Sequence, residues 1–167
     1  MSDPDLIVDA IIEIPRGSSN KYEYDLERGY MKLDRALFSP MFYPADYGFV
    51  PETLSGDGDP IDILVLMNNP TFPGCLIESR VIGMFVMSDD KGKDEKLIAV
   101  PIHDPRYDEV HSLGDLSSHT EKEFEHFFKE YKRLEEKEVI IDGWFNVRDA
   151  KETLMESIER YKEANKI

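Results

Sequence analysis

Residues 54–67, LSGDGDPIDILVLM, join a glycine-rich acidic loop to an uninterrupted apolar run. Every position after Asp62 in this stretch is apolar, so both faces of a strand formed there would be covered by other elements. The stretch therefore predicts a central, buried strand over residues 60–67. Asp57, Asp59 and Asp62 stand at its start, and like charges repel one another more strongly as water is excluded.

Other runs in the first hundred residues also have the composition of β-strands. Each is rich in β-branched, aromatic or other apolar residues and is bounded by turn residues. We expect strands over residues 6–14, 21–26, 30–34, 76–89 and 96–102. The polar segments ERG and DKGKDE would form hairpin connections, the first after residue 26 and the second after residue 89.

The last third of the chain has helical periodicity. Apolar residues recur at intervals of three and four along one face of a predicted helix, at Phe124, Phe127, Phe128, Tyr131 and Leu134. Thr120 and Glu123 have the spacing of a capping box at its start. Residues 138–147 are predicted to form a further strand or extended segment.

A second helix is predicted from about Asp149. Its inward stripe would be formed by Leu154, Ile158 and Tyr161. Glu156 and Arg160 are four residues apart, the spacing of an ion pair along a helix. Strands first and helices last is typical of the α+β class and predicts a small β-barrel with the helices packed outside it.

The composition is that of a globular protein. A chain of 167 residues with 41% hydrophobic and 33% charged residues has the size of one domain, so we expect residues 1–167 to form a single domain. No apolar run approaches the roughly 20 residues of a membrane span, which predicts no membrane partner. The N-terminal MSDPDLIVDA carries acidic residues where an export signal carries basic ones. With the lone Cys75, this favours a cytoplasmic protein.

The net charge of the chain indicates which classes of binding partner to expect. The net charge is −15, whereas nucleic-acid binders neutralise phosphates with lysine and arginine, so we expect no nucleic-acid partner. Most of the excess acid is expected to be solvated surface. The acidic loop is different, because its aspartates are clustered beside an apolar strand.

That loop has the donors of a site for a hard cation. Carboxylate oxygens converging on a semi-buried point are what Mg²⁺ or Ca²⁺ requires, and the cation removes their mutual repulsion. The alternative without a metal ion is an Asx-turn whose aspartates lie on the surface. An EF-hand loop is excluded, because the sixth position from Asp57 is Asp62 rather than glycine and the twelfth is Asn68 rather than glutamate.

Further charged and phenolic residues accompany the loop. A second acidic group consists of Asp89, Asp90 and Asp94. Cations and phenols stand at element edges, at Lys21, Arg35, Tyr43, Tyr47, Tyr131 and Lys132. Each has an ordinary structural interpretation by itself. Together with the carboxylates, they suit a polyanionic substrate that arrives with Mg²⁺.

The segment DGDPIDI (57–63) matches the D-x-D-P-x-D-[aliphatic] signature of the family I soluble inorganic pyrophosphatases, which the chain resembles over nearly its whole length. The other matching segments occur in the same order: EIPRGSSNKYEYD, LDR, FYPADYGFVPETLS, VIGMFVMSDDKGKDEKLIAVP and HFFKEYKRLE. The resemblance implies a five-stranded OB-like barrel with two helices. It implies hydrolysis of pyrophosphate, bound as its Mg complex, with several Mg²⁺ ions per active site. It also implies a homohexamer, as is common among prokaryotic members.

The resemblance further implies roles for individual residues. The implied ligands of the activating metal ions are Asp57, Asp62 and Asp94, with Asp62 bridging two of these ions. Asp89 and Asp94 would hold a further ion that comes with the substrate. Glu13 and Glu23 would help to hold another metal ion. The implied substrate contacts are Lys21, Arg35, Lys96, Tyr131 and Lys132. Tyr47 matches a phenol beside the nucleophile, and Tyr43 matches a second active-site tyrosine on the substrate side.

Asp59 is our candidate for the catalytic base. Two metal ions lower the pKa of a shared water towards neutrality, and a nearby carboxylate can orient that water and take its proton. Two alternatives stay open. One is another Mg-dependent hydrolase of nucleoside triphosphates or polyphosphate, although the sequence has no P-loop. The other is an OB-type nucleic-acid module, which the net charge disfavours.

Overall fold

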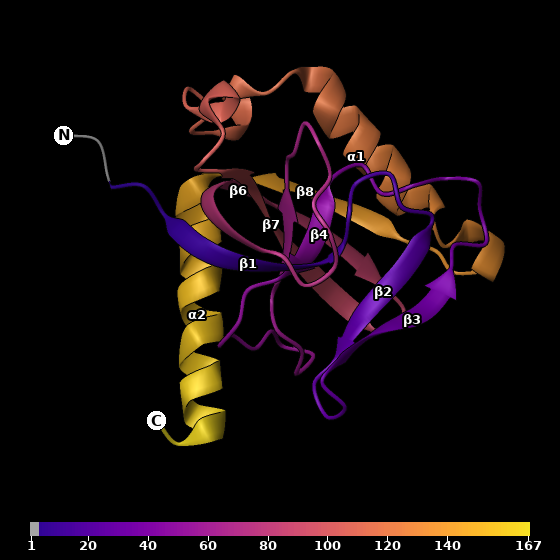
Figure 1. Ribbon diagram of the computed structural model, residues 1–167, viewed down its shortest axis with the longest axis horizontal. Helices are drawn as coiled ribbons and strands as arrows, with labels where there is room; N and C mark the ends of the chain where they lie inside the picture. The colour runs from indigo at the N-terminus through magenta and orange to yellow at the C-terminus, as the bar shows by residue number, and fades with distance from the viewer. Residues whose placement is uncertain (1–3) are drawn as a thin grey trace.

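The structure is a computed structural model that describes residues 4–167 (Figure 1). Its first seven elements are strands, and helices occur only after the seventh strand. The strands are β1 (Ile7–Ile14), β2 (Asn20–Asp25), β3 (Tyr30–Ala36), β4 (Asp46–Phe49), β5 (Asp62–Val65), β6 (Leu76–Asp89), β7 (Gly92–Pro101) and β8 (Ile140–Phe145). The helices are α1 (Ser118–Glu130) and α2 (Val147–Asn165), with 3₁₀ turns at Pro105–Tyr107, Leu113–Asp115 and Arg133–Glu135. The expected lack of an export signal partly concerns residues 1–3, which lie outside the described residues.

The main sheet closes on itself. Its strands follow the order β1-β4-β5-β7-β6-β8, and β1 also pairs with β6, so five strands form a ring and β8 extends it beside β6. β2 and β3 form a separate antiparallel hairpin. In Figure 1, α2 runs along one side of the barrel near β1, and α1 covers the other side. The expected α+β fold class, a small five-stranded barrel with two helices in the second half of the chain, is confirmed.

Both faces of β5 are buried, as its uninterrupted apolar sequence predicts. Leu64 belongs to a hydrophobic cluster that includes Phe128 of α1. Ile63 belongs to a second cluster that includes Leu154 of α2. Successive residues of a strand point to opposite faces, so a strand covered on both sides must be apolar at every position. Among the described residues, no helix is long and apolar enough to cross a membrane.

The structure corrects two predicted strand boundaries and adds a strand. Residues 60–67 form a strand only over Asp62–Val65. The DKGKDE connection is tighter than expected: Asp89 pairs with Gly92, whose φ of +116° permits the sharp turn. Asp94 therefore lies within β7. The four-residue strand β4 was not predicted, because DYGF is too short for a local pattern to identify.

The first helix begins and ends earlier than its periodicity suggests. Ser117 is its N-cap and accepts a hydrogen bond from the backbone N–H of His119, so the capping box assigned to Thr120 and Glu123 is wrong. α1 ends at Glu130 with Tyr131 as its C-cap, and the chain leaves α-helical geometry at Lys132. Leu134 lies in a 3₁₀ turn with 64% of its surface exposed, and does not continue the buried stripe.

The second helix begins two residues before the predicted start. The Asn146 side chain caps it by accepting a hydrogen bond from the backbone N–H of Asp149. Leu154 is buried as expected. The predicted pair of Glu156 with Arg160 is wrong: the guanidinium donates instead to the backbone carbonyl of Leu54, 2.8 Å away. Exposed ion pairs along a helix contribute little, so a carbonyl from a neighbouring loop can replace one.

Gly48 allows β4 to approach β1, and we expect a substitution there to destabilise the barrel. A Cβ atom at this position would lie 1.8 Å from the carbonyl oxygen of Ile11, and backbone cannot move aside as a side chain can. Gly48→Ala should lower the midpoint of thermal unfolding by at least about 2 °C, since overpacking costs about 1–3 kcal/mol or more. Gly56→Ala is the control, because its added methyl meets nothing within 4 Å. Equal midpoints for the two variants would contradict this account.

Candidate active site

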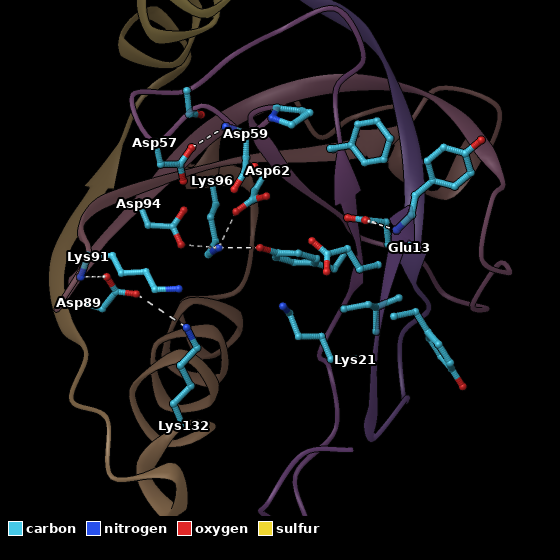
Figure 2. A pocket seen from close by; sticks show the side chains of 18 of the residues that line it. Glu13, Lys21, Asp57, Asp59, Asp62, Asp89, Lys91, Asp94, Lys96 and Lys132 are labelled. Carbon is cyan, nitrogen blue, oxygen red and sulfur yellow. Dashed lines mark hydrogen bonds and ion pairs between the residues drawn. The ribbon is translucent and has the colours of Figure 1, made fainter. Parts of the chain in front are cut away.

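A cavity of about 480 Å³ lies between the β2–β3 hairpin, the β6–β7 hairpin and the loop before β5 (Figure 2). Of the site residues predicted from the sequence, those that line it are Glu13, Lys21, Glu23, Tyr47, Asp57, Asp59, Asp62, Asp89, Asp94, Lys96, Tyr131 and Lys132. Arg35 and Tyr43 do not line the cavity. Barrel strands, a separate hairpin and the end of α1 thus bring together groups that are far apart in the sequence.

The acidic loop is held by hydrogen bonds of its own. The backbone N–H of Asp59 donates to Oδ1 of Asp57 at 2.9 Å, and that of Ser55 donates to the carbonyl of Asp59 at 2.7 Å. Gly58, between the two aspartates, has a φ of +89°, a conformation that favours glycine. Asp62 is the first residue of β5 and therefore belongs to the barrel wall. The loop presents two carboxylates on a tight turn and the third on a rigid strand.

The buried ammonium group of Lys96 lies at the floor of the cavity. Its Nζ donates to Oη of Tyr47 at 2.7 Å, to Oδ2 of Asp62 at 2.9 Å and to Oδ2 of Asp94 at 3.0 Å (Figure 2). The parallel register of β5 with β7 places Lys96 opposite Asp62, and Asp94 lies two residues earlier on the same face. The three acceptors match the three N–H donors of an ammonium group.

Charge balance keeps Lys96 protonated. Burial opposes its charge, but the attraction of the Asp62 and Asp94 carboxylates is larger and raises its pKa well above the ordinary value. Burial and the charge of Asp62 raise the pKa of Asp94 despite the neighbouring ammonium. Burial also raises the pKa of Asp59, with the charges of Asp57 and Glu23 adding to the effect. Burial is the main cause of both increases, and neighbouring carboxylates add to it, so a bound cation would stabilise the ionised forms.

The donor set fits a hard divalent cation, although the carboxylates do not form a closed cage. Among residues 4–167, no group of three or more acidic, histidine or cysteine side chains lies close enough to hold a metal ion as it stands. The Lys96 ammonium contacts both Asp62 and Asp94, so these two carboxylates are already charge-paired. All the donors around the acidic loop are nevertheless carboxylate oxygens, which Mg²⁺ prefers, and their uncompensated charge would be relieved by a cation.

Glu13 joins the barrel to the β2–β3 hairpin. Its Oε2 accepts a hydrogen bond from the backbone N–H of Tyr24 at 2.8 Å. Burial raises its pKa to about 7 against that hydrogen bond, and the charges of Asp62 and Glu23 contribute to the increase. Glu13 is the penultimate residue of β1, and Glu23 lies on β2. The two glutamates therefore extend the acidic surface from the barrel onto the hairpin.

Arg35 stands behind the cavity wall in a chain of ion pairs. Asp34 Oδ2 lies 3.1 Å from Nζ of Lys21 and 2.6 Å from Nη1 of Arg35. Arg35 Nη2 donates to Oε2 of Glu135 at 3.3 Å, while its Nε lies 2.9 Å from Oε1 without hydrogen-bond geometry. Sequence reasoning missed Asp34 and Glu135. The LDR segment contains Asp34, but nothing local indicates a partner 100 residues away.

The phenols occupy two layers. Tyr47 and Tyr131 line the cavity, whereas Tyr43 is 1% exposed and packs behind them, with its ring centroid 5.6 Å from that of Tyr47 and 4.8 Å from that of Phe127. Burial raises the pKa of Tyr47 well above the ordinary value, with the charge of Asp62 adding to the effect. Tyr47 is therefore protonated. Its oxygen accepts from Lys96, which leaves its O–H free to donate.

The remaining cations come from the segment after α1 and from the β6–β7 hairpin. Nζ of Lys132 lies 3.7 Å from Oδ2 of Asp89. Burial lowers the pKa of Lys132, and the attraction of Asp89 opposes this. Lys91 and Lys93 also line the cavity and were not predicted as site residues. The sequence contained a signal for them, because both lysines lie between Asp89 and Asp94, which were predicted as site residues. The short turn then brings the lysines close to both carboxylates.

Comparisons with known proteins identify relatives. The model of the family "Inorganic pyrophosphatase" matches residues 10–162. The inorganic pyrophosphatase of Geobacillus stearothermophilus is 56% identical over 157 residues, which are 94% of this chain and 95% of the relative. The crystal structure of the inorganic pyrophosphatase of Thermus thermophilus superimposes with a TM-score of 0.92 at 45% identity, covering 97% of this chain and 94% of the other. The Helicobacter pylori enzyme gives a TM-score of 0.92 at 42% identity, covering 96% of each chain.

The family model and these relatives match nearly the whole chain, so no unmatched segment of it is as long as a domain. The carboxylate loop, the buried lysine and the flanking cations all fall within the residues that the family model matches. The chain belongs to the inorganic pyrophosphatase family.

Proposed function

We propose that this protein hydrolyses inorganic pyrophosphate to two orthophosphates with the help of bound Mg²⁺. One observation carries the proposal: a single cavity brings together a cluster of carboxylates, a buried lysine and lysines from several walls. Pyrophosphate is a small polyanion, so it would bind such a cavity through cations placed between it and the carboxylates. The membership of the family supports the same reaction.

The carboxylates would hold the metal ions. We assign the activating ions to Asp57, Asp62 and Asp94, and assign further ions to Asp89 with Asp94 and to Glu13 with Glu23. When bound, divalent ions supply an acidified water and positive charge for the phosphate oxygens. Lys96 holds Asp62 and Asp94 in fixed orientations, so these ligands need little reordering.

Asp59 is the proposed base. It stands on the loop turn rather than on a strand, and its carboxylate is not among the acceptors of the Lys96 ammonium. It can therefore take the proton of an attacking water within the cavity. The free O–H of Tyr47 is placed to donate a hydrogen bond to that water or to a phosphate oxygen.

The cations would bind the phosphoryl groups and neutralise charge as the bridging oxygen leaves. Lys21 and Lys132 reach the cavity from opposite walls, and Tyr131 adds a phenol beside Lys132. Arg35 is proposed to contact phosphate as well, although its guanidinium is now held by Asp34 and Glu135. Guanidinium and ammonium groups aimed at developing charge are a large part of catalysis in phosphoryl transfer.

Catalysis should depend on the metal. Phosphate release from pyrophosphate should be lost on chelation with EDTA and restored by an excess of Mg²⁺, because the carboxylates repel the substrate when no cation balances them. The measurement is colorimetric phosphate release at a fixed enzyme concentration. Full activity in excess chelator would rule out the proposed mechanism.

The aspartates of the loop should separate by role. Asp59→Asn should lower kcat by about 10²–10⁴-fold, as expected for a positioned base, with a smaller change in Mg²⁺ affinity. Asp62→Asn should weaken Mg²⁺ binding and activity together, because it removes a ligand and a partner of Lys96. Mg²⁺ titration and steady-state kinetics measure both effects. Asp108→Asn, at an exposed position outside the cavity, is the control. Near-normal turnover in Asp59→Asn would exclude Asp59 as the base.

We also infer a homohexamer, as the resemblance to prokaryotic members implies. Large apolar side chains that an assembly would cover are exposed on the chain, among them Phe38, Phe42, Phe72 and Ile140. Light scattering should therefore report about six times the 19.3 kDa chain mass, a closed symmetric assembly. A monomer at micromolar concentration would contradict this inference and leave the chemistry unaffected.

A further inference from the structure

Lys91 occupies a fixed position at the rim of the cavity. It lies in the turn between β6 and β7, and its backbone N–H donates to Oδ1 of Asp89 at 2.8 Å. Gly92 follows with a positive φ and closes the hairpin opposite Asp89. Figure 2 shows the Lys91 side chain extending from this turn towards the interior of the cavity, on the same side as Asp94 and Lys132.

The ammonium group of Lys91 makes no ion pair with the described residues. The other basic residues of the site that were predicted from the sequence are each paired with carboxylates: Lys21 with Asp34, Arg35 with Asp34 and Glu135, Lys96 with Asp62 and Asp94, and Lys132 with Asp89. Within residues 4–167, Lys91 takes part in none of the ion pairs, although it lines the same cavity. An ammonium group that makes no ion pair can bind an anion without first breaking a contact with a carboxylate.

Lys91 shares the cavity with the acidic loop and with Lys21. Lys21 stands on the β2–β3 hairpin, and Lys91 stands on the β6–β7 turn. The two lysines therefore enter the cavity from different walls.

Lys93 lines the cavity too, but its side chain is placed differently. Asp94 and Lys96 are two residues apart on β7 and share the face that points to Tyr47 and Asp62. Side chains alternate along a strand, so Lys93 leaves β7 on the opposite face from Asp94. Lys91 lies in the turn before β7, so the alternation of side chains along the strand does not set the direction of its side chain.

We propose that Lys91 is a further substrate-binding residue, which contacts one phosphoryl group of pyrophosphate from the wall across from Lys21. This inference rests on the proposed function. Lys91 would contribute to binding of the substrate more than to the chemical step, because its exposed, flexible side chain meets the phosphate before and after bond cleavage alike. Its loss should therefore raise KM and leave kcat nearly unchanged.

The test is binding of methylenediphosphonate, a pyrophosphate analogue that is not hydrolysed, measured by calorimetry in the presence of Mg²⁺. Lys91→Met keeps the length of the side chain and removes the charge. It should weaken binding of the analogue and raise KM for pyrophosphate, each by about three- to tenfold, with kcat changed by less than about twofold. Added salt should reduce the difference from the wild-type protein, because an exposed charge is screened. Lys91→Arg should restore most of the affinity.

Lys151→Met is the matched control, since Lys151 is exposed on α2 and lies outside the cavity. It should bind the analogue as the wild-type protein does. Wild-type affinity in Lys91→Met, or a loss confined to kcat, would overturn the inference while the proposed function stands. Failure of the wild-type protein itself to bind the analogue would overturn the proposed function and this inference together. Equal midpoints of thermal unfolding show that the variants are folded.

Discussion

The buried ammonium of Lys96 is the interaction on which the candidate site depends. Moving an ammonium group and carboxylates out of water costs several kcal/mol for each charge, so neither Lys96 nor its partners would be stable there alone. Together they satisfy one another: Asp62, Asp94 and Tyr47 take up its three donors. The parallel pairing of β5 with β7 fixes this geometry, so the closed barrel is what keeps two acidic groups beside one cation.

The two walls of the cavity are held in different ways. The floor belongs to the barrel, whose strands are covered on both sides. The β2–β3 hairpin is a separate two-stranded sheet, tied to the barrel at Glu13 and to the segment after α1 through Arg35 and Glu135. A hairpin of two strands is only marginally stable by itself. Glu13 and Arg35, which are assigned to metal and substrate, therefore also help to hold this wall in place.

Electrostatics explains why an acidic protein can accept an acidic ligand. The chain carries a net charge of −15, and the predicted site cations are each paired with a carboxylate of the protein. A polyanion entering the cavity must compete for those cations, whereas metal ions add positive charge without such competition. Lys91 differs from the predicted cations because its charge is available.

The sequence by itself determined that strands come first and helices last, the doubly covered strand within residues 60–67 and the acidic loop before it, because these depend on patterns within a few residues. It also carried the family resemblance. The tertiary structure alone decided which charges meet, since Asp62 and Lys96 are 34 residues apart and Arg35 and Glu135 are 100 apart. Strand register and barrel closure set such contacts, and local periodicity contains no information on either. The same physics placed Arg160 against a loop carbonyl rather than its helical neighbour.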